Sequence, residues 1–214
     1  MCGIAGIAGE SIDPDIVPAM IVMMKHRGPD NSGFYLSDMV HLGHARLAIN
    51  DLTKLANQPF LSKEHNIAVS LNGEIYNFKD FKGPLEQKGY KFQSWSDSEI
   101  VLHAYIEYGL KFISDLNGMF GISIWDGNKK ELYLIRVRLG IKPLYYAKAG
   151  HQLLFASELK ALAQYRKLDL SIDFQSFAEY VAFENIFANR TLNRNIKMVS
   201  PGEIVSFHLR DYSI

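Results

Sequence analysis

The sequence predicts an α+β fold in which stacked antiparallel sheets are covered by helices. Short apolar strands come in two runs, one over residues 2–76 and one over residues 120–156, and helical patterns follow each run. Strands grouped in this way, instead of alternating one by one with helices, are typical of α+β layering. Tight turn signals at residues 126–128 and 149–150 join neighbouring strands, which favours antiparallel pairing.

The composition excludes several classes of protein. The 23 Lys and Arg residues balance 23 Asp and Glu residues, and no run of like charge occurs, so nucleic acid is not an expected partner. A single cysteine forms no internal disulfide, and no CxxC pair offers a zinc site, which favours a reducing compartment. No stretch approaches the roughly 18 apolar residues of a membrane span, and no leader pattern is present, so we expect a cytoplasmic protein.

The first part of the chain reads as a buried strand, a helix and a strand pair. Residues 2–8 combine small and branched apolar side chains, as buried strands do. Asp13 or Asp15 is expected to cap a helix whose methionine-rich face belongs to the core. Residues 34–36 and 40–47 then predict two strands joined by a polar turn, all within one domain over residues 1–214.

The next strand leads to a dipeptide with a strong local preference. Residues 67–71 predict a strand that reaches Asn72-Gly73 and resumes at residues 74–76. Asn-Gly between apolar runs is the strongest short signal for a hairpin, so a type I′ turn is expected here.

Helices and a meander are expected in the second half. Asn77 should cap a short helical stretch that Gly83-Pro84 interrupts, and residues 96–99 open the clearest helix, which Gly109 ends. Four strands in a meander are expected to follow at residues 120–125, 132–137, 144–146 and 153–156. Two helices, at residues 158–165 and 173–183, and a last strand at residues 203–207 complete the expected chain.

Cys2, directly after Met1, has a chemical use if Met1 is removed. Its thiol and a free α-amino group would then share one Cα. An α-amino group titrates at about 7.7 to 8.0 and a thiol at about 8.5, so the amine can take the thiol proton directly or through one water. One residue would act as nucleophile and base, like an N-terminal threonine. The alternative interpretation is a small buried hydrophobe.

Five motifs give the chain a family resemblance. In order and spacing they resemble the glutaminase domain of asparagine synthetases, and they occupy residues 2–7 (CGIAGI), 26–30 (HRGPD), 71–77 (LNGEIYN), 96–99 (SDSE) and 140–146 (GIKPLYY). The resemblance covers nearly the whole chain and implies a class II, N-terminal-nucleophile (Ntn) glutamine amidotransferase domain. It also implies the fold of Ntn hydrolases, a four-layer α/β/β/α sandwich of two stacked antiparallel sheets.

The resemblance also implies a role for each site residue. Cys2 would attack the side-chain amide of glutamine and form a thioester, while the Asn72 side chain and the Gly73 N–H hold the oxyanion. Arg46 would pair with the substrate α-carboxylate and Asp97 with its α-ammonium group. Further glutamine-binding residues are expected along the pocket, namely Leu47, Ala48, Ile49, Asn50 and Glu74.

The same resemblance predicts partners beyond this chain. It implies that ammonia passes to a docked synthetase domain or subunit, which would bind ATP and Mg and cover an exposed apolar patch of more than a few hundred Å². No cofactor or metal is expected in this domain, and a homodimer is compatible with the pattern. Two alternatives stay open, a degenerate glutaminase fold that serves as a binding or regulatory module, and ammonia supply to a different amide-forming synthetase.

Two positions depart from the family pattern. Val137 follows Arg136 where relatives usually carry aspartate, and Asn50 replaces a common apolar residue. We expect Val137 to affect local packing or interface contacts more than glutamine hydrolysis.

Overall fold

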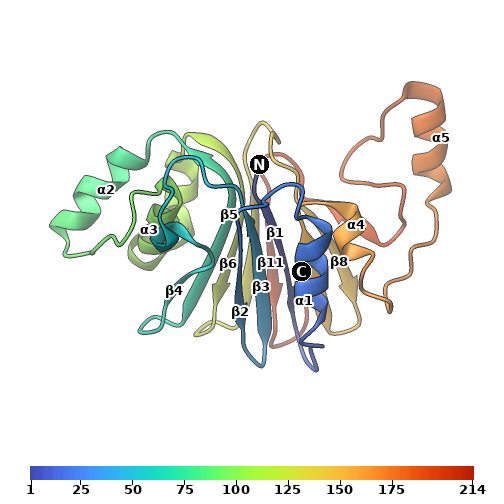
Figure 1. Cartoon of the computed structure of the whole chain (residues 1–214). Helices are drawn as coiled ribbons and strands as arrows, with labels where there is room; N and C mark the ends of the chain where they lie inside the picture. Colours follow the sequence, from blue (N-terminus) through green and yellow to red (C-terminus); the bar gives the residue numbers. More distant parts are fainter.

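The computed structural model describes residues 1–214 as two antiparallel sheets packed face to face between helices (Figure 1). The first sheet contains β1 (Gly3–Ala8), β2 (Asn31–Leu36), β3 (Val40–Arg46), β8 (Tyr145–Ala149), β9 (Gln152–Ala156) and β10 (Ile196–Met198). The second contains β4 (Phe60–Ser62), β5 (Ile67–Ile75), β6 (Gly118–Asp126), β7 (Glu131–Arg136) and β11 (Ile204–His208). The helices are α1 (Ile16–Met23), α2 (Phe78–Gln87), α3 (Ile100–Tyr108), α4 (Leu159–Leu162) and α5 (Phe174–Phe183).

The layers follow the predicted α/β/β/α order. The strand order is β10-β8-β9-β1-β3-β2 in the first sheet and β11-β7-β6-β5-β4 in the second. Helices α1 and α4 cover the outer face of the first sheet, and α2 and α3 cover the outer face of the second (Figure 1). Helix α5 stands apart from the sandwich, with only Ser176 of its residues buried. None of these helices is long and apolar enough to span a bilayer.

Three apolar clusters fill the spaces between the layers. One lies under α1 and includes Met20, one lies between the sheets and includes Trp125 and Phe155, and one lies under α3 and includes Phe112. The central strand β1 belongs to two of them because its side chains alternate between the faces. Cys2 directly precedes β1. By the same alternation its side chain points between the sheets.

The expected four-strand meander is wrong, because β6–β7 and β8–β9 belong to different sheets. The chain crosses between the sheets over residues 137–144. Arg136 closes this crossing by donating to the carbonyl oxygens of Gly140 (2.6 Å), Lys142 (3.0 Å) and Val199 (2.7 Å). Gly140 has a φ of 63°, which lets the crossing turn back toward β8.

The expected type I′ turn at Asn72-Gly73 is also wrong. Both residues lie inside β5, opposite Gly121 and Phe120 of β6. The glycine serves a close approach between strands, since Gly73 has a φ of 153° and an added Cβ would lie 1.9 Å from the Met119 carbonyl oxygen. A long ladder with β6 therefore overrides the local hairpin preference.

Several helix boundaries differ from the prediction. Helix α2 runs through Gly83-Pro84, and α4 is confined to four residues instead of residues 158–165. Pro84 is tolerated because the carbonyl that loses its partner belongs to Asp80, in the exposed first turn. Asn77 does not cap the helix, since its side chain bonds the Asp115 carbonyl and the Asn117 N–H.

Smaller differences occur at other elements. Strands β4 and β10 were not predicted. The side chain of Asp13, and not that of Asp15, accepts a bond at the start of α1, from the Asp15 N–H at 3.0 Å.

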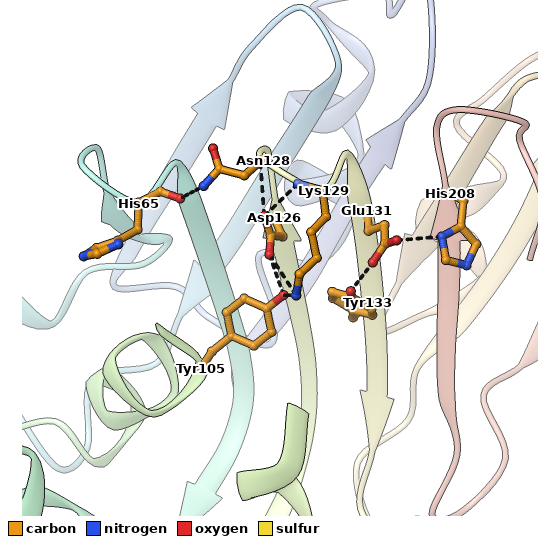
Figure 2. A network of polar contacts seen from close by, with 8 residues as sticks. All are labelled: His65, Tyr105, Asp126, Asn128, Lys129, Glu131, Tyr133 and His208. Carbon is orange, nitrogen blue, oxygen red and sulfur yellow. Dashed lines mark hydrogen bonds and ion pairs between the residues drawn. The ribbon is translucent and has the colours of Figure 1, made fainter. Parts of the chain in front are cut away.

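A polar network closes one end of the second sheet (Figure 2). Tyr105 of α3 donates to Asp126 at 2.7 Å, and Lys129 approaches both groups, at 3.1 Å from the Tyr105 hydroxyl and 3.3 Å from the carboxylate. On the neighbouring strands, Glu131 pairs with His208 at 2.9 Å. The network anchors α3 to the β6–β7 hairpin, at the opposite end of β6 from Gly118.

Candidate active site

A cavity of about 190 Å³ lies between the two sheets, where β1 begins and β3 and β5 end. It brings together nine of the predicted site residues, namely Cys2, Arg46, Leu47, Ile49, Asn50, Asn72, Gly73, Glu74 and Asp97. Ala48 does not line it, and its N–H donates to Asp30 Oδ2 at 2.8 Å in an exposed contact. Residues distant in sequence thus meet at one hollow.

The Cys2 side chain lies at the start of β1, half-buried, against the end of β3. The Leu47 N–H donates to its sulfur at 3.4 Å, and the Leu47 carbonyl lies 3.7 Å from the same atom. Burial raises the pKa of the thiol, although the Leu47 bond and the positive charges of the N-terminus, Arg46 and Arg27 lower it in part. A thiol with a raised pKa needs a base to become a nucleophile.

The Asn72 side chain has an unused donor in the cavity wall. Asn72 is 1% exposed, and its Nδ2 has no hydrogen-bond partner. A buried amide donor without a partner costs roughly 1–3 kcal/mol in a folded protein. Such an atom, in a cavity shared with a thiol, is available for an oxygen of a bound molecule.

The edge of β5 offers a second donor beside the first. Tyr76 directs its N–H to β6, so by alternation residues 71, 73 and 75 direct theirs to the opposite edge. There the Leu71 N–H donates to Gln58 at 2.6 Å and the Ile75 N–H to Asp97 at 2.6 Å. Strand β4 pairs only as far as Val69, which leaves the Gly73 N–H facing the cavity.

Arg46 is buried and held by the loop that follows β3. Both hydrogens of NH1 are used, by the Thr53 carbonyl at 2.7 Å and Asn57 Oδ1 at 2.6 Å, and NH2 donates to the Asp51 carbonyl. An arginine has five N–H donors. The Nε–H and one NH2 hydrogen therefore have no partner in the structure, and they are charged donors that a bound carboxylate could accept from.

Asp97 supplies negative charge at the other side of the cavity. Besides the Ile75 N–H, its carboxylate lies 3.4 Å from Asn50 Nδ2 and 3.5 Å from Ser98 Oγ. The Asn50 side chain thus lies in the site, next to the Asp97 carboxylate. A neighbouring carboxylate, Asp51, accepts from the Trp95 N–H at 2.9 Å and so ties the Arg46 loop to the Asp97 loop.

A comparison with known families agrees with this geometry. The model of the family described as glutamine amidotransferase domain matches residues 1–213. The chain belongs to this family. The amidotransferase domain is 41% identical to asparagine synthetase [glutamine-hydrolyzing] 2 of Bacillus subtilis (strain 168), over 76% of the domain and 22% of the synthetase. It is 36% identical to synthetase 1 of the same organism, over 94% of the domain and 33% of the synthetase.

Other relatives extend the picture. The domain is 44% identical to amidase chry2 of Gibberella zeae, over 65% of the domain and 21% of the amidase. Among solved structures, glutamine phosphoribosylpyrophosphate amidotransferase from B. subtilis matches 97% of the domain and 49% of its own chain, with a TM-score of 0.66 and 18% identity. The latter likeness confirms the fold. The domain spans between about a fifth and a third of the curated relatives described.

His44, Gln58 and Lys142 are among the cavity residues of the amidotransferase domain that the sequence analysis did not predict. His44 donates from Nε2 to the Leu71 carbonyl at 3.2 Å, and burial lowers its pKa to about 4, so the ring is neutral. Gln58 holds the Leu71 N–H. Lys142 is 6% exposed and forms no ion pair. Lys142 lies in the GIKPLYY motif, which gave a signal, whereas His44 and Gln58 stand in stretches without one.

Proposed function

We propose that this amidotransferase domain hydrolyses the side-chain amide of glutamine to glutamate and ammonia through a thioester on Cys2. The observation that carries the proposal is the pair of unused donors, Asn72 Nδ2 and the Gly73 N–H, in the cavity that holds the Cys2 thiol. Two such donors suit the oxyanion of a tetrahedral intermediate, and one alone contributes about 2.7–4 kcal/mol in other enzymes.

The reaction begins with a proton transfer within Cys2. Once Met1 is removed, the free α-amine takes the thiol proton, and the sulfur attacks the amide carbon of glutamine. The oxyanion forms against Asn72 and Gly73, and collapse returns the proton to the leaving nitrogen, which departs as ammonia. Water then attacks the thioester, glutamate leaves, and the thiol regains its proton.

Two opposite charges orient the substrate. The unpaired donors of Arg46 bind the α-carboxylate, and the Asp97 carboxylate binds the α-ammonium group. Glutamine carries both charges on one carbon, so the pair fixes the amino-acid end. The amide end then points toward Cys2.

The ammonia passes, we propose, to an ATP-dependent amidation of the asparagine-synthetase type in a second domain. The relatives described as asparagine synthetases are several times longer than the matched segment, which supports a docked domain that holds the ATP and Mg. Leu139 and Ile141 are 80% and 51% exposed beside Lys142, which lines the cavity. The second domain would cover this loop and the exposed apolar side chains of α5.

A different acceptor is the second candidate, since amidase chry2 shares 44% identity with the domain. Assays of the full-length protein with ATP and aspartate decide between the two. Asparagine formation supports the first acceptor, and glutamine hydrolysis without asparagine supports the second.

We further propose a cytoplasmic location and a glutaminase step without a metal or cofactor, so that dialysis against a chelator leaves this step intact. The homodimer stays a prediction, and sedimentation measurements of the molecular mass in solution can test it.

The decisive experiment compares glutaminase activity of the wild-type domain with Cys2→Ala and Cys2→Ser variants. We expect glutamate release from the wild type and none above background from either variant, because both lose the thiolate. Thermal unfolding of each variant provides the control for folding. Activity retained in Cys2→Ala would rule out the thioester, and an inactive, folded wild type without Met1 would favour the binding-module alternative.

A further inference from the structure

We infer that Glu158 is a positioning residue for the nucleophile, acting on Cys2 through Arg27. The inference rests on the proposed function and adds a group outside the cavity. Glu158 lies just after β9, and Arg27 lies in the segment that follows α1. Neither of these elements contributes a residue to the oxyanion or glutamine contacts described above.

Two contacts, both made by Arg27, carry the effect. Arg27 donates from Nε to the Cys2 carbonyl at 2.8 Å, and its NH1 donates to Glu158 Oε1 at 3.0 Å. The guanidinium is planar, so fixing NH1 also fixes the direction of Nε–H. Arg27 is 8% exposed, and Glu158 is the carboxylate with which it forms an ion pair. Glu158 thus determines where the Cys2 carbonyl is held.

Cys2 needs such a hold because it precedes the first paired residue of β1. Gly3 is the first residue of the ladder with β3, and the pairing with β9 begins only at Ala5. Ser157 extends that edge: its Oγ accepts from the Ile4 N–H at 3.0 Å, and its N–H donates to the Ile4 carbonyl at 2.9 Å. Ser157 and Glu158 therefore clamp consecutive parts of the segment that carries the thiol.

The charges around Glu158 set the sign of its effect on Cys2. The carboxylate meets His26 at 2.9 Å, Arg27 at 3.0 Å and Lys160 at 3.2 Å. Arg27 is one of the positive groups that lower the Cys2 pKa, with the N-terminus and Arg46. Removing the negative charge of Glu158 leaves Arg27 uncompensated, so the thiol should become more acidic even as its position loosens.

The test uses the alkylation of Cys2, the single cysteine of the chain, together with glutamine kinetics. Glu158→Gln keeps the shape and loses the charge. Glu179→Gln is the matched control, because Glu179 forms the same kind of ion pair with Arg190 on the α5 side of the molecule. Mass analysis first verifies that each protein has lost Met1. Three measurements follow: the rate of alkylation by iodoacetamide from pH 6 to 10, kcat and KM for glutamine hydrolysis, and the melting temperature.

For Glu158→Gln we expect kcat to fall between roughly tenfold and a hundredfold with KM little changed, because the nucleophile is misplaced while the substrate contacts remain. The pH at which the alkylation rate reaches half its maximum, the alkylation midpoint, should move to a lower value. Glu158→Asp, which keeps the charge, should leave the midpoint in place and serves if Glu158→Gln does not fold. The Glu179→Gln control should match the wild type in all three measurements.

Two results would overturn the inference. One is a folded Glu158→Gln variant with wild-type kcat and alkylation profile. The other is a loss of activity that only follows the folded fraction, with an unmoved midpoint. A wild type that hydrolyses no glutamine would contradict the proposed function alone, since alkylation is measured without glutamine.

Discussion

His44 donates a hydrogen bond across the space between the sheets, from Nε2 to the Leu71 carbonyl at 3.2 Å. His44 lies on β3, beside the strand that begins after Cys2, and Leu71 directly precedes Asn72 on β5. This contact therefore links the strand next to the proposed nucleophile with the strand that carries the proposed oxyanion donors. The geometry of the proposed site depends on how the two sheets pack.

Acid should weaken this link. Burial lowers the pKa of His44 to about 4, whereas an unfolded histidine titrates near 6.5. Between these values the unfolded state binds more protons, so stability rises with pH and is lost as pH falls from 6.5 toward 4. In urea unfolding, His44→Gln should lose less stability than the wild type over this window, by an amount on the order of 3 kcal/mol. The exposed His151→Gln control should keep the wild-type slope, and equal slopes for all three proteins would remove His44 as the cause.

The second prediction concerns Arg46→Lys, which should raise the KM for glutamine by roughly ten- to a hundredfold. Lysine keeps the charge but lacks the planar guanidinium that holds Thr53 and Asn57 together and still has donors left for the substrate. One lost charge-assisted bond accounts for about 1.5–3 kcal/mol. Arg166→Lys, at an exposed position, is the control. Steady-state kinetics with an unchanged KM would take Arg46 out of the substrate contacts.

A third prediction separates binding from catalysis at Asn72. Asn72→Ala should lower kcat by about 10²–10³ and change KM little, because the oxyanion exists only along the reaction. Since Nδ2 is unpaired in the free domain, the same change should cost little stability. Steady-state kinetics test the effect on kcat and KM, and thermal unfolding tests the effect on stability. A variant with normal turnover would contradict the oxyanion role.

A fourth prediction concerns two glycines of different kinds. Gly73→Ala should destabilise the domain, since the new Cβ would lie 1.9 Å from the Met119 carbonyl and the φ of 153° disfavours alanine. Gly83→Ala, in α2 and with no atom within 4 Å of the new Cβ, should stabilise it by about 0.5–1 kcal/mol. If Gly73→Ala and Gly83→Ala shift the melting temperature in the same direction, the close approach inferred at Gly73 is contradicted.

The fifth prediction follows from the need for a base. A form that retains Met1 should be inactive, because the Cys2 nitrogen is then a peptide nitrogen without a basic lone pair. Mass analysis of the N-terminus beside a glutaminase assay of trimmed and untrimmed fractions tests this. A fully active untrimmed fraction would disprove the role of the amine.

The sequence predicted the site better than the turns that hold it. Cys2 and Asp97 lie in motifs that occur in the family's order along the chain, and the resemblance that these motifs carry also implies Arg46 as a site residue. The local preference of Asn72-Gly73 is strong and predicts a hairpin turn there, which the structure does not contain. The partner that overrides it, β6, begins more than forty residues later, at Gly118, and no local pattern reports such a pairing.

The structure also explains the unusual Val137. Arg136 points between the sheets, so alternation along β7 turns the next side chain to the outer face. There Val137 is buried in the apolar cluster under α3, and its N–H bonds the Phe120 carbonyl at 3.0 Å. An apolar residue suits this place, and Val137 does not line the cavity that holds Cys2.

The central position of β1 has a consequence for maturation during synthesis. Its two neighbours, β3 and β9, end at Arg46 and Ala156, so β1 cannot be paired on both edges until residue 156 has left the ribosome. At roughly 5–20 residues per second, that interval lasts roughly 8 to 30 seconds. An aminopeptidase that trims Met1 has freest access to the nascent end in this interval, before Arg27 fixes the Cys2 carbonyl. Slower translation of the first 156 codons should therefore increase the fraction of chains that carry a mature nucleophile.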